Sequence, residues 1–247
     1  VSPEDFGAVG DGVTDDAPAF ATMLSSVATS KRPIRLRPVI YRLANTSPLR
    51  LPDGLCMYGS ADRQGVSRLD WRGSGASMFD SDPNAYMSAL NISNMEILCG
   101  NNTAGNIGTG DAIKLYGLCN NSRISNVLIR NFPGNAITLA KQTLNPSDAT
   151  ACGNVCFNQI FVVSCGGYAF DVDGYVNAVW NMCDFNSPAT GGYRFRSGIS
   201  NQAQITIIGQ WWEGTQSWSA TNVIKMDSPS GQVLNLFGGT FQNNIAG

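Results

Sequence analysis

The stretch Ile124-Ser125-Asn126-Val127-Leu128-Ile129 carries the pattern that decides the fold. Apolar residues stand at its first, fourth and sixth positions, and close copies of this pattern return along most of the chain. Successive copies begin 23 to 33 residues apart. A repeat of this length is typical of a solenoid. The copies are Ile92–Ile97, Phe157–Val162, Trp180–Phe185, Ile207–Trp212 and Leu236–Phe241.

A second apolar alternation lies between these copies. Strict period-two alternation predicts short strands with one buried face and one face in water. Gly, Asn and Ser turns separate the two sets of strands. Two or three short strands in each turn, each paired with its copy one turn on, predict an all-β fold, a right-handed single-stranded parallel β-helix. The second set reads Ile113–Tyr116, Ile137–Ala140, Phe170–Asp173, Tyr193–Arg196 and Ile224–Asp227.

The composition favours one elongated domain. The chain has 247 residues, of which 14% are charged and 27 are glycines, and its net charge is -2. Such a charge gives no reason to expect nucleic acid as a partner, and no apolar run approaches the roughly 18 residues of a membrane span. There is no initiator Met, and the last repeat ends close to residue 247, so we expect a fragment or an end that a partner covers.

Seven cysteines and no histidine argue against a metal site of paired ligands. Cys152 and Cys156 are the closest pair in sequence. Cys183 falls in the same inward position of the repeat as Val127 and Ile160, where a small apolar side chain belongs. We expect reduced thiols in the core, which indicates assembly in a cytoplasm.

Residues 1–30 differ from the repeats and are expected to form an N-terminal strand and a short capping α-helix, while residues 31–247 form the β-helix. The expected order is a strand around Phe6 and Val9, a Gly-Asp-Gly turn, and a helix capped by Thr14 or Asp16. This helix would cover the open end of the solenoid. Its apolar face consists of Phe20, Met23, Leu24 and Val27.

The stretch from Asp5 to Asp16 resembles the N-terminal motif of the pectate-lyase-like superfamily, and Leu51-Pro52-Asp53-Gly54 continues the likeness. The chain is most similar in this respect to phage tailspike and tail-fibre proteins. The resemblance implies a homotrimer in the virion tail, assembled in the bacterial cytoplasm, that recognises bacterial surface polysaccharide. The polygalacturonase-type motifs of the superfamily are absent, because there is no histidine and the only Asp-Asp pair, Asp15-Asp16, lies in the N-terminal motif.

Aligning the repeats predicts which outward residues share a column on neighbouring rungs. Leu128, Phe161 and Trp211 are expected in one such column, pointing to solvent. An exposed aromatic row requires a partner, either a sugar chain or an identical subunit. The expected substrate-binding residues are Phe161, Trp211, Trp218, Arg130 and Asn186.

Asp184 and Glu213 are the candidate catalytic residues. They are expected on adjacent rungs, offset by two residues, which places their Cα atoms roughly 7–8 Å apart. Such a separation suits an inverting glycosidase that needs no metal and no cofactor. Trp211, beside both, is expected to desolvate one carboxyl group and so raise its pKa, as an acid catalyst requires.

The second strands carry outward charges that we interpret as solvated ion pairs. Asp171 is expected to face Arg194, and Asp173, Arg196 and Asp227 to form an alternating ladder. Each such pair is worth less than about 1 kcal/mol. A lyase site built on these arginines and aspartates with calcium is the weaker interpretation.

Two further alternatives stay open. The chain is a non-catalytic structural or receptor-binding module of a virion, or it is a secreted monomeric polysaccharide lyase or hydrolase.

At one corner of the coil, Asn94, Asn126 and Gln159 are expected to stack with left-handed backbone. Polar surface loops are expected at Leu98–Asp111, Lys141–Val155 and Glu213–Asn222.

Overall fold

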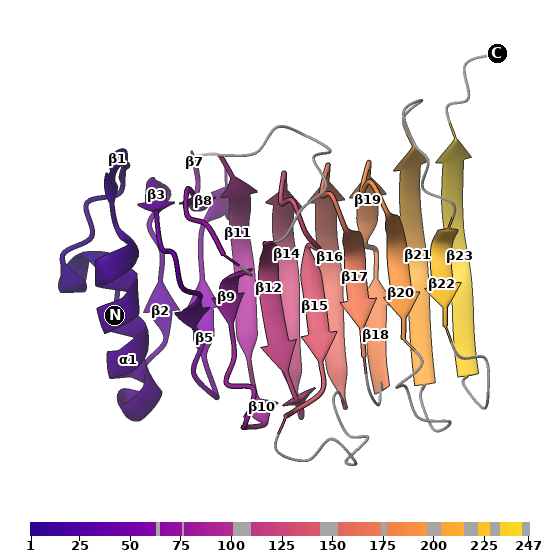
Figure 1. The fold of residues 1–247 in the computed structure, drawn as a ribbon, viewed down its shortest axis with the longest axis horizontal. Coiled ribbons are helices and arrows are strands. Elements are labelled where there is room, and N and C mark those ends of the chain that lie inside the picture. The colour runs from indigo at the N-terminus through magenta and orange to yellow at the C-terminus, as the bar shows by residue number, and fades with distance from the viewer. Residues whose placement is uncertain are drawn as a thin grey trace.

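The computed structural model describes residues 1–62, 65–75, 77–100, 110–143, 153–173, 177–196, 204–214, 222–227 and 233–243. The chain winds into a right-handed parallel β-helix whose turns stack along one axis, with the N-terminal helix at one end (Figure 1). The predicted fold class is therefore confirmed. Most of the three expected surface loops lies outside the described residues.

Two long sheets run the length of the coil, one behind the other in Figure 1. The first contains the copies of the six-residue pattern: β11 (Asn91–Cys99), β14 (Ser122–Arg130), β16 (Val155–Val163), β18 (Asn177–Asn181), β19 (Asp184–Asn186), β21 (Gln204–Gly214) and β23 (Val233–Asn243). It begins with β1 (Asp11–Asp15), β2 (Ile34–Arg35), β3 (Ile40–Leu43), β5 (Cys56–Tyr58) and β8 (Arg68–Trp71).

The second sheet holds the strands of the second alternation. It consists of β4 (Leu49–Arg50), β9 (Ser77–Asp80), β12 (Asp111–Tyr116), β15 (Ile137–Ala140), β17 (Tyr168–Val172), β20 (Gly191–Phe195) and β22 (Asn222–Met226). Neighbours in both sheets pair in parallel, as successive turns of one coil must. Two small pairings complete the described strands, β6 (Ala61–Asp62) with β7 (Gly65–Val66) and β10 (Met87–Ser88) with β13 (Leu118–Cys119).

A sharp bend divides each long strand of the first sheet. Asn94, Asn126 and Gln159 adopt left-handed backbone there, with φ of 59°, 53° and 54°, as predicted. Met182, Gly209 and Gly238 continue the column, with φ of 51°, 60° and 65°. We call the outward side of the strands beyond this bend the post-bend face, which is formed by the outward-pointing residues among 68–72, 96–98, 128–130, 161–163, 184–186 and 211–213.

The core consists of the inward residues of both sheets. Phe157 stacks on Trp180 with ring centroids 5.4 Å apart, and Phe170 stacks on Tyr193 at 5.7 Å. Such pairs contribute about 0.5–1.5 kcal/mol each beyond the burial of their area. The rigid stack fixes the spacing of the outward side chains on the opposite side of each strand.

The N-terminal segment differs from the predicted order. A 3-10 helix, η1 (Pro3–Phe6), replaces the expected strand, because the Ser2 backbone N–H donates to the Asp5 carboxylate (2.8 Å) and starts a turn. The first strand, β1, instead begins at Asp11, within the expected Gly-Asp-Gly turn. The prediction of a strand at Phe6 and Val9 was therefore wrong.

The capping helix α1 (Ala17–Ser30) is confirmed, and the four residues of its predicted apolar face are buried against the first coil. Asp16 occupies the N-cap position, but its carboxylate accepts from the backbone of Val9 and Gly10 at 2.7 and 3.2 Å. It therefore fixes the preceding loop, and Asp15 accepts from Ala17 N at 3.1 Å. Thr14 does not cap the helix. No described helix has the length and apolar character to cross a membrane.

The side chains of five of the cysteines are described, and all five are free thiols. Cys183 is buried in the predicted inward position, and Cys165 is buried too. Cys156 is half-buried and unbridged, while its sequence neighbour Cys152 lies outside the described residues.

Thiol labelling is expected to distinguish the buried cysteines from the half-buried ones. Burial raises the pKa of Cys165 and of Cys183 to about 12, so only about one in 10,000 of these groups is thiolate at pH 8. Cys56 and Cys156 are half-buried and should react in the folded protein. Mass spectrometry after brief treatment with a maleimide at pH 8 checks this, with a urea-unfolded sample as control. Rapid modification of Cys183 in the folded protein would contradict the assigned core.

Candidate functional site

The post-bend face brings the predicted aromatic column together. Strand pairing places Leu128 beside Phe161, Phe161 beside Asp184, and Asp184 beside Trp211. The Phe161 side chain is 37% exposed and that of Trp211 is 43% exposed, which is high for aromatic residues on a β-sheet. A carboxylate thus lies between two exposed aromatic side chains, one rung from each.

The two candidate carboxylates occupy adjacent rungs. Asn186 pairs with Glu213 in the same register that pairs Asp184 with Trp211, so Asp184 and Glu213 are offset by two residues, as predicted. Asp184 and Asn186 are half-buried. The side chain of Glu213 and the whole of Trp218 lie outside the described residues.

Arg130 lies on this face but makes an ion pair that the sequence did not predict. Its Nη2 is 2.5 Å from Glu96 Oε1, and Arg68 Nε donates to Glu96 Oε2 at 2.6 Å. Glu96 itself is only 4% exposed. Arg68 was not predicted, because β8 precedes the first recognised copy of the repeat. Its position 28 residues before Glu96, within the range of the repeat length, could have indicated that the two residues are neighbours.

Further apolar side chains widen the aromatic column. Met182 is 58% exposed, Ile208 36% and Phe237 58%, and Ile208 pairs with Phe237 on the neighbouring rung. Met182 was not predicted because it stands at the corner, where the repeat pattern has no apolar position. Together with Phe161 and Trp211, these residues form an apolar patch across the bend of the first sheet.

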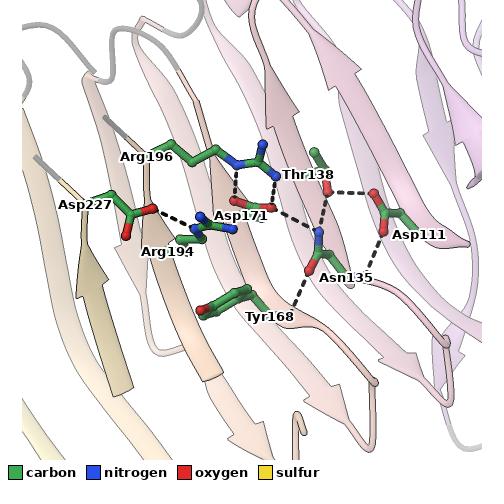
Figure 2. A network of polar contacts seen from close by, with 8 residues as sticks. All are labelled: Asp111, Asn135, Thr138, Tyr168, Asp171, Arg194, Arg196 and Asp227. Atoms are coloured by element: carbon green, nitrogen blue, oxygen red, sulfur yellow. Dashed lines mark hydrogen bonds and ion pairs between the residues drawn. The ribbon is translucent and has the colours of Figure 1, made fainter. Parts of the chain in front are cut away.

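The second sheet carries a separate polar network on its outer side (Figure 2). The predicted pairing of Asp171 with Arg194 was wrong. The two residues are register neighbours, but Arg196 extends back over the strand and forms a two-point ion pair with Asp171. Arg194 instead pairs with Asp227 at 2.8 Å. The Asp171 side chain is 3% exposed, so this pair is not the solvated one that we expected.

The rest of the network joins successive rungs (Figure 2). The Asp111 carboxylate accepts from Asn135 N and from Thr138 Oγ1, both at 2.7 Å. Asn135 in turn accepts from Tyr168 N at 2.7 Å and donates to Asp171 at 3.3 Å. Burial raises the pKa of Asp111, although these hydrogen bonds lower it. Because Asp111 and Asn135 each accept from a backbone N–H of the next rung, we interpret the network as structural.

The chemistry available on the post-bend face is that of carboxylates, amides, guanidinium groups and aromatic rings. Among the described residues, no group of three or more His, Cys, Asp or Glu side chains is arranged to hold a metal ion. The donors and acceptors that this face offers are those that bind sugar hydroxyl groups, and its rings match the apolar faces of pyranoses.

Comparison of the sequence with models of known protein families and with curated proteins returned no match. Solved structures share the fold. A candidate glycosyl hydrolase from Parabacteroides merdae is 13% identical, with a TM-score of 0.61, over 90% of this chain and 98% of that one. Gene product 12 of bacteriophage phi29 is 17% identical, with a TM-score of 0.60, over 88% of this chain and 33% of that one.

A third structure is the tailspike of phage phiAB6, solved with oligosaccharides of Acinetobacter baumannii surface polysaccharide. It is 17% identical, with a TM-score of 0.53, over 97% of this chain and 47% of the tailspike. The chain is a right-handed parallel β-helix, the fold that these structures share. It spans about a third of the phi29 protein and about half of the phiAB6 protein. At these identities the likeness concerns the fold.

Proposed function

We propose that this chain is a phage tailspike-like protein, which binds bacterial surface polysaccharide on its post-bend face and cleaves it by glycosidic hydrolysis. The observation that carries the proposal is the placement of Asp184 between the exposed side chains of Phe161 and Trp211. The sugar-bound state of the phiAB6 tailspike, a protein of the same fold, supports it by analogy.

Phe161 and Trp211 would stack on the apolar faces of sugar rings. They stand two rungs apart in one column, which is roughly 10 Å at the usual strand spacing. A glycan that follows the helix axis would therefore contact both aromatic side chains, with Asp184 beneath the bond between them. Asn186, Trp218 and Arg130 would bind the hydroxyl or acidic groups of the same chain.

Cleavage would follow the inverting course. We assign Asp184 as the general acid that protonates the leaving oxygen, because it lies between the two aromatic side chains that would bind the sugar rings. Glu213, one rung on and offset by two residues, would activate the attacking water as general base. The water proton passes to Glu213 and the Asp184 proton to the leaving sugar, so that hydrolysis needs no metal.

The assembled form we propose is a homotrimer in a virion tail. The exposed apolar patch of Met182, Ile208 and Phe237 extends past the aromatic column and supports contact with an identical subunit. This patch equally favours a second candidate function, a non-catalytic structural module in which a neighbouring subunit covers the column. Light scattering separates the trimer from a secreted monomeric enzyme, which would show a single chain's mass. Release of reducing ends separates the enzyme from the non-catalytic module.

The stacking role predicts a binding loss for Trp211→Ala. Removing a central aromatic anchor typically costs about 2 kcal/mol, so we expect roughly thirtyfold weaker binding of the polysaccharide that the wild type binds. Binding is measured by surface plasmon resonance on immobilised capsular and O-antigen polysaccharides.

The matched control is Phe237→Ala, which removes a still more exposed aromatic side chain beyond the proposed sugar column. If Phe237→Ala binds like the wild type while Trp211→Ala does not, the column is the sugar site. If Trp211→Ala leaves binding intact and Phe237→Ala alters the oligomeric mass, the apolar patch is a subunit interface and the proposed sugar site is wrong.

A further inference from the structure

The N-terminal part of the post-bend face carries arginines that stacking on sugars does not require. Arg68 lies on β8 and Arg130 at the end of β14, while Arg72 directly follows β8. Strand pairing places Arg68 beside Glu96 and Glu96 beside Leu128, the start of the aromatic column. The arginines and the aromatic residues thus share one continuous surface.

The carboxylates of this part lie beneath the arginines. The side chains of Glu96 and Asp70 are 5% and 8% exposed. Those of Arg68, Arg72 and Arg130 are 33%, 38% and 37% exposed. In this part of the post-bend face, the guanidinium groups are therefore exposed to solvent and the carboxylates are almost completely buried. The whole chain, in contrast, has a net charge of -2.

The buried acids also hold the arginines in place. Glu96 binds one arginine with each of its oxygens, and Asp70 binds Arg72 at 2.9 Å. A guanidinium group has five N–H donors, so the bonds of Arg68 and Arg130 to Glu96 leave donors of these two groups for a ligand. Fixed guanidinium groups recognise planar or tetrahedral anions well, because little side-chain entropy is lost on binding.

We infer that the polysaccharide bound on the post-bend face is anionic and carries a carboxylate or phosphate group that contacts Arg68 and Arg130. This inference rests on the proposed polysaccharide binding and adds the chemical class of the ligand. Arg68 and Phe161 are three rungs apart, roughly 14 Å at the usual strand spacing. A few sugar residues along the axis therefore reach from the arginines to the aromatic column.

A neutral glycan would gain little from this surface. Its hydroxyl groups would have to replace the water around guanidinium groups without a compensating charge. An acidic glycan gains charge-assisted hydrogen bonds, and the local positive field raises its rate of association at low salt. The position of the arginines next to the aromatic rings therefore selects polymers with both an acidic group and an exposed sugar face.

The experiment uses the full chain and immobilised bacterial capsular polysaccharides, half of them neutral and half containing uronic acid or phosphate. We expect binding to the acidic polymers alone, and Arg130→Gln is expected to weaken it about tenfold. Glu96 keeps its bond to Arg68 in this variant, so no carboxylate is orphaned. Carboxyl reduction or dephosphorylation of the bound polymer distinguishes the two kinds of anion.

Arg194→Gln is the matched control. Its side chain is 31% exposed on the other sheet, and Asp227 keeps Lys225 as a partner, so the variant loses the same charge elsewhere. If a neutral polymer binds, with Arg130→Gln like the wild type and Trp211→Ala weakened, the inference fails while the proposed function stands. If no polymer binds, the proposed function itself fails.

Discussion

Asp184→Asn is expected to lower the rate of polysaccharide cleavage by about a thousandfold, within the range that general acid catalysis contributes. The amide keeps the shape of the side chain between Phe161 and Trp211 but has no proton to give to the leaving oxygen. Binding should stay within about threefold of the wild type, because the aromatic side chains on either side are unchanged. Reducing-end release from the bound polysaccharide measures the rate.

Two companion variants sharpen this test. Glu213→Gln should lower the rate of cleavage as much as Asp184→Asn does, since the inverting mechanism needs both carboxyl groups. Asp173→Asn removes an outward carboxylate of the second sheet and should cleave at the wild-type rate. If Asp184→Asn and Glu213→Gln both retain full activity, the catalytic groups lie elsewhere, and if the wild type binds but never cleaves, the chain is the non-catalytic module.

Arg196→Met is expected to destabilise the fold strongly. It leaves the buried Asp171 carboxylate with the Asn135 amide at 3.3 Å and without its cation, a change that typically costs about 3–5 kcal/mol. For a chain of this length, the melting temperature should fall by roughly 10 °C. Urea unfolding followed by circular dichroism gives the free energy.

Arg194→Met is the control for this second prediction. Its partner Asp227 is 21% exposed and keeps Lys225 at 3.4 Å, so the loss should stay below about 1 kcal/mol. The double change Asp171→Leu with Arg196→Met should recover most of the stability, because it removes the buried carboxylate together with its cation. Equal losses for the two arginine variants would refute the structural role of the network.

Sequence periodicity predicted the register because each rung repeats the same inward positions. An apolar side chain at Val127 or Ile160 can face only the core, and this fixes which outward residues stand beside one another. The column from Leu128 to Trp211 follows from that constraint alone. The part of the candidate site that consists of columns of outward residues was therefore predictable from the sequence.

Periodicity does not determine where a long side chain ends. Arg196 and Arg194 both lie within reach of Asp171, and the choice depends on rotamers and on the rest of the network. The same limit hid the contact of Arg130 with Glu96. At the N-terminus there is no repeat to align. There a local hydrogen bond from Ser2 N–H to the Asp5 carboxylate stabilises a 3-10 helix where a strand was expected.

The left-handed corner of the first sheet also constrains how the coil can assemble. If one turn docked on its neighbour shifted by one residue, positive φ would fall on Val127 or Ile160 in place of Asn126 or Gln159. Branched side chains tolerate that backbone poorly, at a cost of order 1–3 kcal/mol for each residue. The corner therefore favours the correct register of each turn on its neighbour and makes a misaligned coil less stable.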